Sequence, residues 1–247
     1  MDSHQTPIVV EAEHLRKSFG DNHVLKDINL RLAKGENLAI LGQSGTGKSV
    51  LIKCMVGLLF PDAGRLLVLG KDVADLDDRG LDEMRMKVGF LFQSGALYDS
   101  MTVRENLEFP IRRQMRSKSS AEISALVEES LENVGLSEAI DVMPVELSGG
   151  MRKRLGLART LILKPEIMLY DEPTTGLDPI TSRGISSLIL EVQEKYNTTS
   201  IIVTHDLECT RIVANRVVML EKGICVAEGT YEDLRQSNDP WVRSFFE

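Results

Sequence analysis

A glycine-rich segment early in the chain has the residue types and spacing of a phosphate-binding loop, the P-loop. The segment and the residue after it are Gly42, Gln43, Ser44, Gly45, Thr46, Gly47, Lys48, Ser49 and Val50. Its glycines allow backbone N–H groups to turn toward phosphate oxygens, and the helix expected after it points its positive end at the same anion. Lys48 would supply a cation for the β- and γ-phosphates, and the Ser49 hydroxyl could ligate Mg²⁺. These residues predict a nucleotide-binding site.

Two adjacent acids follow an apolar stretch far along the chain. Residues 167–170 predict a buried strand, and Asp171 and Glu172 come directly after it. Ligands of parallel α/β sheets bind at the carboxyl ends of strands, so both carboxylates should reach the phosphate site. Asp171 would hold Mg²⁺ through its water shell, and Glu172 would orient and deprotonate the attacking water. A polar turn is the alternative, and the P-loop favours the catalytic interpretation.

A third segment, residues 147–151, opens a basic helix. Ser148 is a good N-cap, and Gly149 and Gly150 expose backbone N–H groups behind it. This is a second helix start suited to an anion, in a different part of the chain from the P-loop. Alone, such a string indicates a turn, so its functional interpretation depends on the other motifs.

The elements that must position these residues alternate along the chain. Short apolar runs predict strands over 8–11, 24–32, 37–41, 65–69, 88–92, 167–170, 200–204 and 216–220. Helical spacing predicts helices over 49–59, 121–134, 151–163 and 180–196. Strand–helix–strand order with apolar strands is typical of an α/β fold with a parallel sheet covered on both faces. Between residues 102 and 163 strands vanish and charges increase, which indicates a helical lobe.

Composition limits the class of protein. The chain has 247 residues, 43% of them hydrophobic, and 29 basic against 37 acidic residues give a net charge of −8. This excess of acid argues against general nucleic-acid binding. The scattered Cys54, Cys209 and Cys225 indicate reduced, mostly buried thiols. Residues 1–7 are polar and unlike a secretory signal, and no stretch is long enough to span a membrane, so any membrane role is expected to come through a partner.

Together these motifs resemble the nucleotide-binding subunit of ABC transporters over nearly the whole length. The resemblance implies a P-loop NTPase core of the RecA-like type, with a parallel sheet, an antiparallel β subdomain and an inserted α-helical subdomain. It implies one ABC ATPase domain over 1–247, with a core of 8–92 and 165–235, a helical signature-motif lobe of 93–164 and a tail of 236–247. Whether the tail, with Trp241, Phe245 and Phe246, docks a partner or folds back on the core stays open.

The resemblance also assigns roles to further residues. Phe19 lies where the family stacks an aromatic ring on adenine, and Gln93 where a loop glutamine touches Mg²⁺. His205 matches the switch histidine at the γ-phosphate. The implied catalytic set is Glu172, His205 and Lys48, and the implied metal set is Ser49, Gln93 and Asp171. Ser148, Gly149, Gly150 and Asp178 would act in trans, on ATP bound by a second copy in a head-to-tail homodimer.

One departure from the family pattern narrows the resemblance. Met151 stands where most members have glutamine, and together with residues 91–98, 143–146 and 238–246 it resembles the Mla and Mce-type phospholipid branch. That branch implies an integral-membrane permease, a small accessory subunit and a lipid-binding component as partners. It also implies a cytoplasmic location, peripheral on the cytoplasmic face of the inner membrane. An importer ATPase for a small solute and a non-transport ABC ATPase are the alternatives.

Overall fold

The computed structural model describes residues 6–247, and most of the polar segment 1–7 lies outside them. A ten-stranded sheet runs through the molecule in the order β5-β4-β1-β2-β10-β9-β3-β8-β7-β6. Its parallel part consists of β9 (Arg216–Glu221), β3 (Asn37–Leu41), β8 (Thr199–Thr204), β7 (Ile167–Asp171) and β6 (Val88–Leu91). β3, β7 and β8 are buried along their whole length, as expected of strands covered on both faces.

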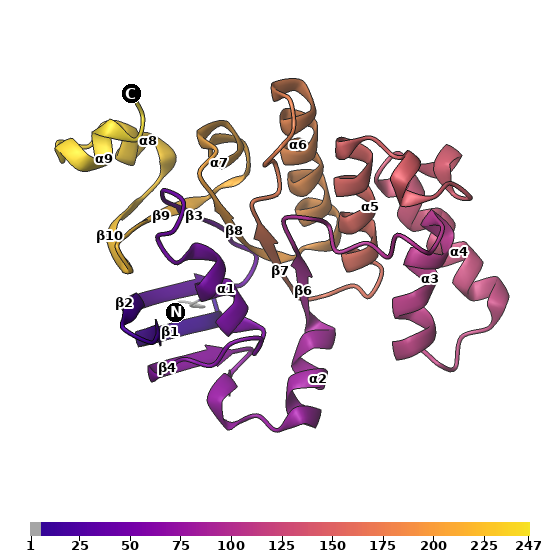
Figure 1. Cartoon of the computed structure of the whole chain (residues 1–247), viewed down its shortest axis with the longest axis horizontal. Helices are drawn as coiled ribbons and strands as arrows, with labels where there is room; N and C mark the ends of the chain where they lie inside the picture. Colours follow the sequence, from indigo (N-terminus) through magenta and orange to yellow (C-terminus); the bar gives the residue numbers. More distant parts are fainter. Residues whose placement is uncertain (1–5) are drawn as a thin grey trace, which may run out of the picture.

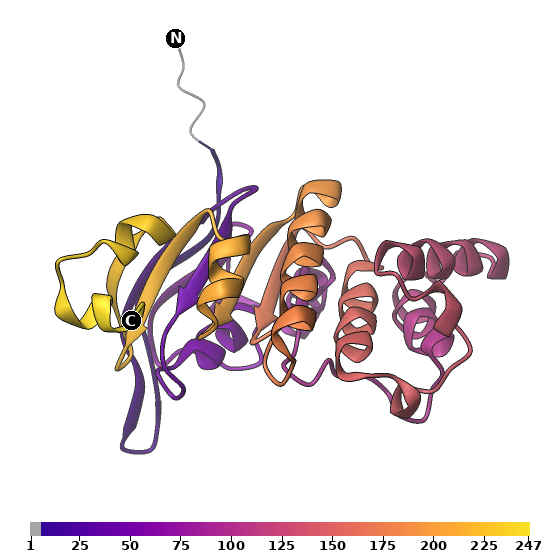
Figure 2. The ribbon, with the colours of Figure 1, turned by 90° about the horizontal axis from the view of Figure 1, so that it is seen from above.

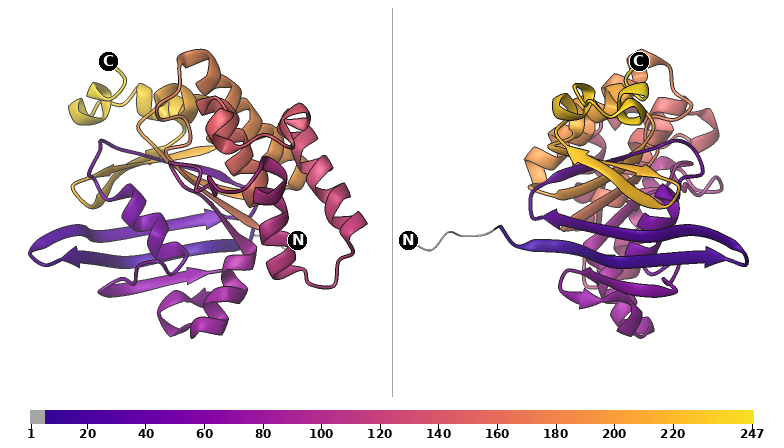
Figure 3. Two further views of the ribbon diagram at one scale, coloured as in Figure 1. Left: turned by 45° about the vertical axis from the view of Figure 1, so that its right-hand side comes forward. Right: turned by 90° about the vertical axis from the view of Figure 1, so that its left-hand side faces the viewer.

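Antiparallel strands extend the sheet at its other end. They are β1 (Ile8–Phe19), β2 (Asn22–Ala33), β4 (Ala63–Val68) and β5 (Lys71–Asp72), and β10 (Ile224–Gly229) joins them to β9, antiparallel to β9 and parallel to β2. β1 and β2 form a long hairpin that lies as a separate layer beside the parallel strands (Figure 3). The layer packs on α1 (Lys48–Met55) through one continuous core that includes Leu25, Ile28 and Ile52.

Helices cover both faces of the parallel strands (Figure 1). α1 lies against one face with the β1–β2 layer, and α6 (Pro179–Tyr196) and α7 (Leu207–Val213) lie on the other. α2 (Asp78–Lys87) packs beside β6. Seen from above, α3 (Val103–Gln114), α4 (Ser120–Asn133) and α5 (Gly149–Leu161) gather at one end of the molecule as a helical lobe (Figure 2).

The helical lobe has its own core, which continues under α6. Leu107 of α3, Val127 of α4, Leu155 of α5 and Ile189 of α6 belong to one buried cluster. α5 also packs against β6 and so joins the lobe to the sheet. Short 3₁₀ turns, Ser137–Ala139 and Pro144–Glu146, connect α4 to α5.

The chain's last segment folds back on the core. β10 leads to α8 (Tyr231–Arg235) and α9 (Pro240–Ser244), where Trp241, Val242, Phe245 and Phe246 pack in a cluster with Leu41 and Met219. Of the two alternatives for this tail, the structure has the folded-back arrangement. Within residues 6–247, no helix combines the length and the apolarity that a membrane span requires.

Several elements differ from the expectation. β1 is twelve residues long rather than four, because it pairs with β2 and β4 on both sides. The first helix ends at Met55, and Gly57 follows with a positive φ of 64°. α3 was not predicted: Pro110 in its interior argues against a helix, but a capping box of Thr102 and Glu105 starts it and its apolar face is buried.

Candidate functional site

The P-loop, Glu172 and His205 lie close together because the strands that precede them are neighbours in the sheet. β3, β8 and β7 lie side by side in parallel, so their carboxyl ends share one edge of the sheet. The P-loop follows β3, Glu172 follows β7 and His205 follows β8. A cavity of about 340 Å³ opens at this edge, lined by Val24, Ser44, Gly45, Gly47, Lys48, Ser49, Val50, Gln93, Glu172, Thr175 and His205.

Two glycines of the P-loop lie so close to neighbouring residues that no side chain would fit there. A Cβ atom on Gly42 would lie 2.5 Å from the carbonyl oxygen of Leu220, and one on Gly47 would lie 2.8 Å from Leu25 Cδ2. Gly47 also has a φ of 105°, which L-residues rarely adopt. Lys48, 5% exposed, donates to the carbonyls of Gly42 (2.7 Å) and Gln43 (3.1 Å). These two hydrogen bonds hold the Lys48 ammonium at the cavity.

Contacts to one of its two oxygens, Oε2, orient the carboxylate of Glu172. Oε2 accepts hydrogen bonds from Thr175 Oγ1 (3.2 Å) and Thr204 Oγ1 (3.3 Å) and lies 2.9 Å from His205 Nδ1. Oε1 lies 3.4 Å from Lys48 Nζ. Glu172 as a whole residue is 9% exposed. Oε2 thus has three partners, and the one partner of Oε1 is the Lys48 ammonium.

Ser49 and Asp171 form the part of the site suited to a divalent cation. The Ser49 hydroxyl donates to Asp171 Oδ1 at 2.7 Å, so two hard oxygen donors meet beside the P-loop. Within the described residues, no group of three or more His, Cys, Asp or Glu side chains could hold a metal ion. The Ser49 hydroxyl and the Asp171 carboxylate fit Mg²⁺, which is commonly bound through one or two protein oxygens with the remaining ligands from nucleotide phosphates and water. Gln93 lines the same cavity.

The segment around Ser148 lies elsewhere. Ser148 caps α5 by accepting from the Met151 N–H at 3.3 Å, as expected of an N-cap. Its glycines pack against the start of α6: a Cβ on Gly149 would lie 3.3 Å from Leu177 Cδ2. Asp178 caps α6 through the N–H groups of Ile180 and Thr181. Ser148, Gly149, Gly150 and Asp178 are not among the residues lining the P-loop cavity.

Phe19 ends β1 at the tip of the hairpin, with 48% of its surface exposed. The ring is therefore not part of the hydrophobic core. Lys17 Nζ lies 5.5 Å from its centroid. Phe19 does not line the P-loop cavity, whereas Val24 of β2 does.

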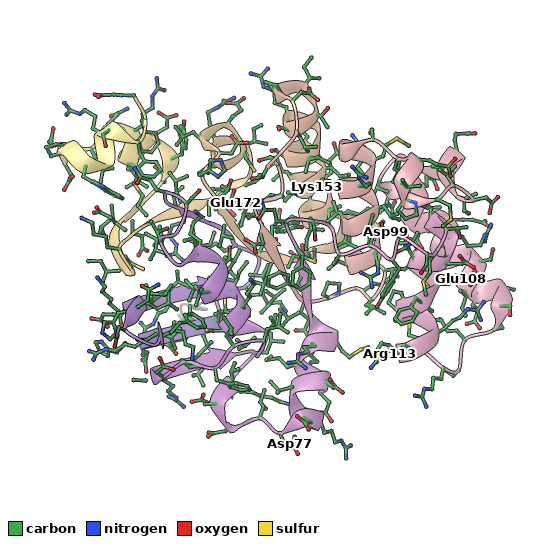
Figure 4. All side chains as sticks on the ribbon, in the orientation of Figure 1. Asp77, Asp99, Glu108, Arg113, Lys153 and Glu172 are labelled. Carbon is green, nitrogen blue, oxygen red and sulfur yellow. The ribbon has the colours of Figure 1, made fainter. Side chains whose placement is uncertain are left out.

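Three residues at the site were not predicted. Thr175 and Thr204 orient Glu172, and both could have been found from their spacing, three residues after Glu172 and one before His205. The third is Lys153, which lies in the basic helix after Ser148 and for which the sequence predicted no role. Figure 4 labels Lys153 and Glu172 near one another, at the junction of the helical lobe and the sheet.

Comparisons with known proteins agree with this geometry. Residues 25–175 match the ABC transporter family. A Mycobacterium leprae protein, "Probable ribonucleotide transport ATP-binding protein mkl", is 42% identical over 96% of this chain and 68% of its own length. The Haemophilus influenzae "Intermembrane phospholipid transport system ATP-binding protein MlaF" is 41% identical over 96% of this chain and 89% of its own. A solved dimeric ATP-binding cassette in a post-hydrolysis state, bound to ADP and Pi, has a TM-score of 0.82 at 32% identity and covers 90% of this chain and 98% of its own.

The chain belongs to the ABC transporter family and is an ABC-type ATPase. The expected fold class, a P-loop NTPase core with antiparallel and helical subdomains, is confirmed. Other mycobacterial relatives named mkl are covered over 66% of their length, so this chain spans about two thirds of those proteins.

Proposed function

We propose that this ATPase powers a membrane transporter of phospholipids, as a homodimer bound to an integral-membrane permease on the cytoplasmic face of the inner membrane. The name of the Haemophilus relative and the Met151 pattern support the lipid substrate. The mycobacterial relative's name supports a different cargo, a ribonucleotide, as the second candidate. A small accessory subunit and a lipid-binding component belong to the same proposal.

The observation that carries the catalytic part is the fixed carboxylate of Glu172. With Oε2 held by Thr175, Thr204 and His205, Oε1 points toward Lys48 and the cavity. We infer that phosphate binding draws the Lys48 ammonium away, because three phosphate oxygens attract it more strongly than two backbone carbonyls do. Oε1 is then the acceptor for the proton of the attacking water. His205 holds the carboxylate and faces the γ-phosphate.

The remaining cavity residues bind and orient the nucleotide. Gly42, Gln43, Ser44, Gly45, Thr46, Gly47 and Val50 would cradle the phosphates, and Phe19 would stack on the base. Ser49, Asp171 and Gln93 would hold Mg²⁺, which neutralises phosphate charge. These donors occupy one side of the γ-phosphate. Ser148, Gly149, Gly150 and Asp178 of a second copy would close the other side, so that two sites form at a two-fold interface.

The catalytic part is tested with Glu172→Gln. The amide keeps the size of the side chain and cannot take the proton, so turnover should fall roughly 10²–10⁴-fold while ATP affinity is kept. ATP should then hold the variant as a dimer, visible in size-exclusion chromatography. Normal turnover of the purified variant would remove Glu172 from this role.

The cargo is tested by co-purification from detergent-solubilised membranes. The proposal expects a permease to accompany the chain, and phospholipid to be extracted with the complex in amounts that change with ATP. A complex that carries no phospholipid and instead binds a ribonucleotide would favour the second candidate. A chain that brings down no membrane protein would favour a non-transport ATPase.

A further inference from the structure

Lys153 is a lysine buried inside the protein at the junction of the two lobes. It lies in the second turn of α5, and 7% of its surface is exposed. Its neighbours in the basic run, Arg152 and Arg154, are exposed and partly exposed. Lysine is among the residues least often buried, so the position of this ammonium requires an explanation.

The ammonium joins three segments of the chain. Lys153 Nζ donates to the carbonyl of Gln93 (2.5 Å), in the loop after β6, and to the carbonyl of Glu172 (3.3 Å), after β7. Lys153 itself is carried by α5, whose N-cap is Ser148. The Lys153 side chain therefore connects α5, which Ser148 caps, to the loop that contains Gln93 and to the backbone of the proposed general base, Glu172.

Glu172 has a backbone conformation that its surroundings must maintain. Its φ is 50°, in the left-handed region, which costs a residue other than glycine of order 1–3 kcal/mol. Its N–H donates to the carbonyl of Val203 at 2.9 Å, and its carbonyl accepts from Thr175 N–H at 3.3 Å as well as from Lys153. Hydrogen bonds therefore hold the backbone of Glu172 at its N–H and at its carbonyl. The backbone conformation at Glu172 sets the direction in which its side chain leaves the chain, and so the place of the carboxylate.

Burying the charge has an electrostatic cost. Burial lowers the pKa of the Lys153 ammonium, and the carboxylates of Glu172 and Asp171 act in the opposite direction. A methionine of similar shape would avoid this desolvation, but it would remove the donor from the Gln93 and Glu172 carbonyls. These two hydrogen bonds are what hold the buried ammonium in place.

We propose that Lys153 is a positioning residue for hydrolysis: its ammonium holds the Glu172 backbone in the conformation that aims the carboxylate, and it links that conformation to the place of α5. The inference rests on the proposed role of Glu172 as general base. Since α5 begins at the segment proposed to contact a second copy's ATP, a shift of this helix would reach Glu172 through the Lys153 ammonium.

The first test compares Lys153→Met with a matched control on the same helix. Arg159 Nη1 donates to the Ala96 carbonyl at 2.7 Å, in the same loop, and its guanidinium lies 4.7 Å from the Tyr98 ring centroid. Arg159→Met removes a cation that hydrogen-bonds to this loop and makes no hydrogen bond to Glu172.

We expect Lys153→Met to lower kcat roughly 10- to 100-fold at unchanged ATP affinity, the range that a small misplacement of a reacting group produces. Arg159→Met should stay within about twofold of the unmodified protein, since it leaves that geometry intact. Equal kcat in the two variants would overturn the proposal.

The second test asks whether the effect passes through Glu172. Groups that act as a unit are not additive, so Lys153→Met should change the residual turnover of Glu172→Gln less than about twofold. A full 10-fold loss in that background would mean that Lys153 acts by another route, such as Gln93, and would overturn the proposal. Normal turnover of Glu172→Gln alone would instead refute the proposed function. Thermal unfolding of each variant confirms that it is folded.

Discussion

A Cβ atom on Gly150 would lie 2.5 Å from Cγ2 of Thr181. The two residues belong to the first turns of α5 and α6, so these helix starts touch at a glycine. Thr181 Oγ1 donates to Asp178 Oδ2 at 2.5 Å, which fixes the rotamer that places the methyl group there. The contact explains within one chain why position 150 has room only for glycine, separately from any role of Gly150 toward a second copy.

Gly150→Ala should therefore destabilise the protein by about 1–3 kcal/mol, the usual cost of overpacking. Gly149→Ala should cost less, because its Cβ would lie 3.3 Å from Leu177 Cδ2, at the end of a side chain that can shift. Denaturant unfolding measures both. Thr181→Ser removes Cγ2 and keeps the hydroxyl, so it should restore the stability of Gly150→Ala. A double variant as unstable as the single one would show that another contact is responsible.

A second prediction concerns Ile180, a residue that is 83% exposed and directly follows Asp178 and Pro179. If this segment faces a second copy, Ile180→Asp should weaken ATP-dependent dimerisation of the Glu172→Gln variant at least about 10-fold. Burying one isoleucine contributes about 1.5–3 kcal/mol, and a two-fold interface contains it twice. Analytical ultracentrifugation with ATP measures the change. Ile224→Asp, at a position 41% exposed on β10, is the matched control and should leave dimerisation unchanged.

The third prediction concerns the free thiols. Burial raises the pKa of Cys54 and of Cys225 to about 11 and that of Cys209 to about 12. The thiolate is the reactive form, so at pH 8 alkylation in the folded protein should be roughly 100-fold slower than in denaturant for Cys54 and Cys225, and roughly 1,000-fold slower for Cys209. The rate should rise about tenfold per pH unit as the pH approaches these values. Mass spectrometry after iodoacetamide treatment measures it, and rapid labelling of folded protein at pH 8 would contradict the burial.

The motifs could be predicted from sequence because each is contiguous. Gly42 to Ser49 specifies its own loop, and Ser148 caps α5 as its residue type indicates. The contact between His205 and Glu172 was not predicted, because its geometry depends on β7 and β8 being neighbours, which no local pattern fixes. Lys153 is the clearest limit. Its spacing to Leu157 and Leu161 places it on the buried face of α5, but its charge, like that of Arg152, indicates an exposed side chain. Its bonds to Gln93 and Glu172 depend on the tertiary fold.

The fourth prediction concerns the shared site. Lys48→Ala and Gly149→Asp should each abolish hydrolysis in a homodimer, because each damages both composite sites. In a mixed dimer one site combines the damaged P-loop with the damaged Ser148–Gly150 segment. The other combines an intact P-loop, from the Gly149→Asp chain, with an intact segment from the Lys48→Ala chain. Activity should therefore reappear on mixing, limited by the fraction of mixed dimers and by cooperation between the sites.

A single polypeptide that tethers the two variants removes the uncertainty of subunit exchange. If each chain completed its own site, both halves would stay damaged and no activity would return. Absence of recovery would leave two explanations, sites that complete in cis or strict cooperation between trans sites. A tether with one Gly149→Asp half and one unmodified half separates them. Strict cooperation leaves this tether inactive, because one composite site is damaged. Completion in cis leaves its unmodified half hydrolysing ATP at about half the rate of the unmodified tether, since one of its two sites is intact.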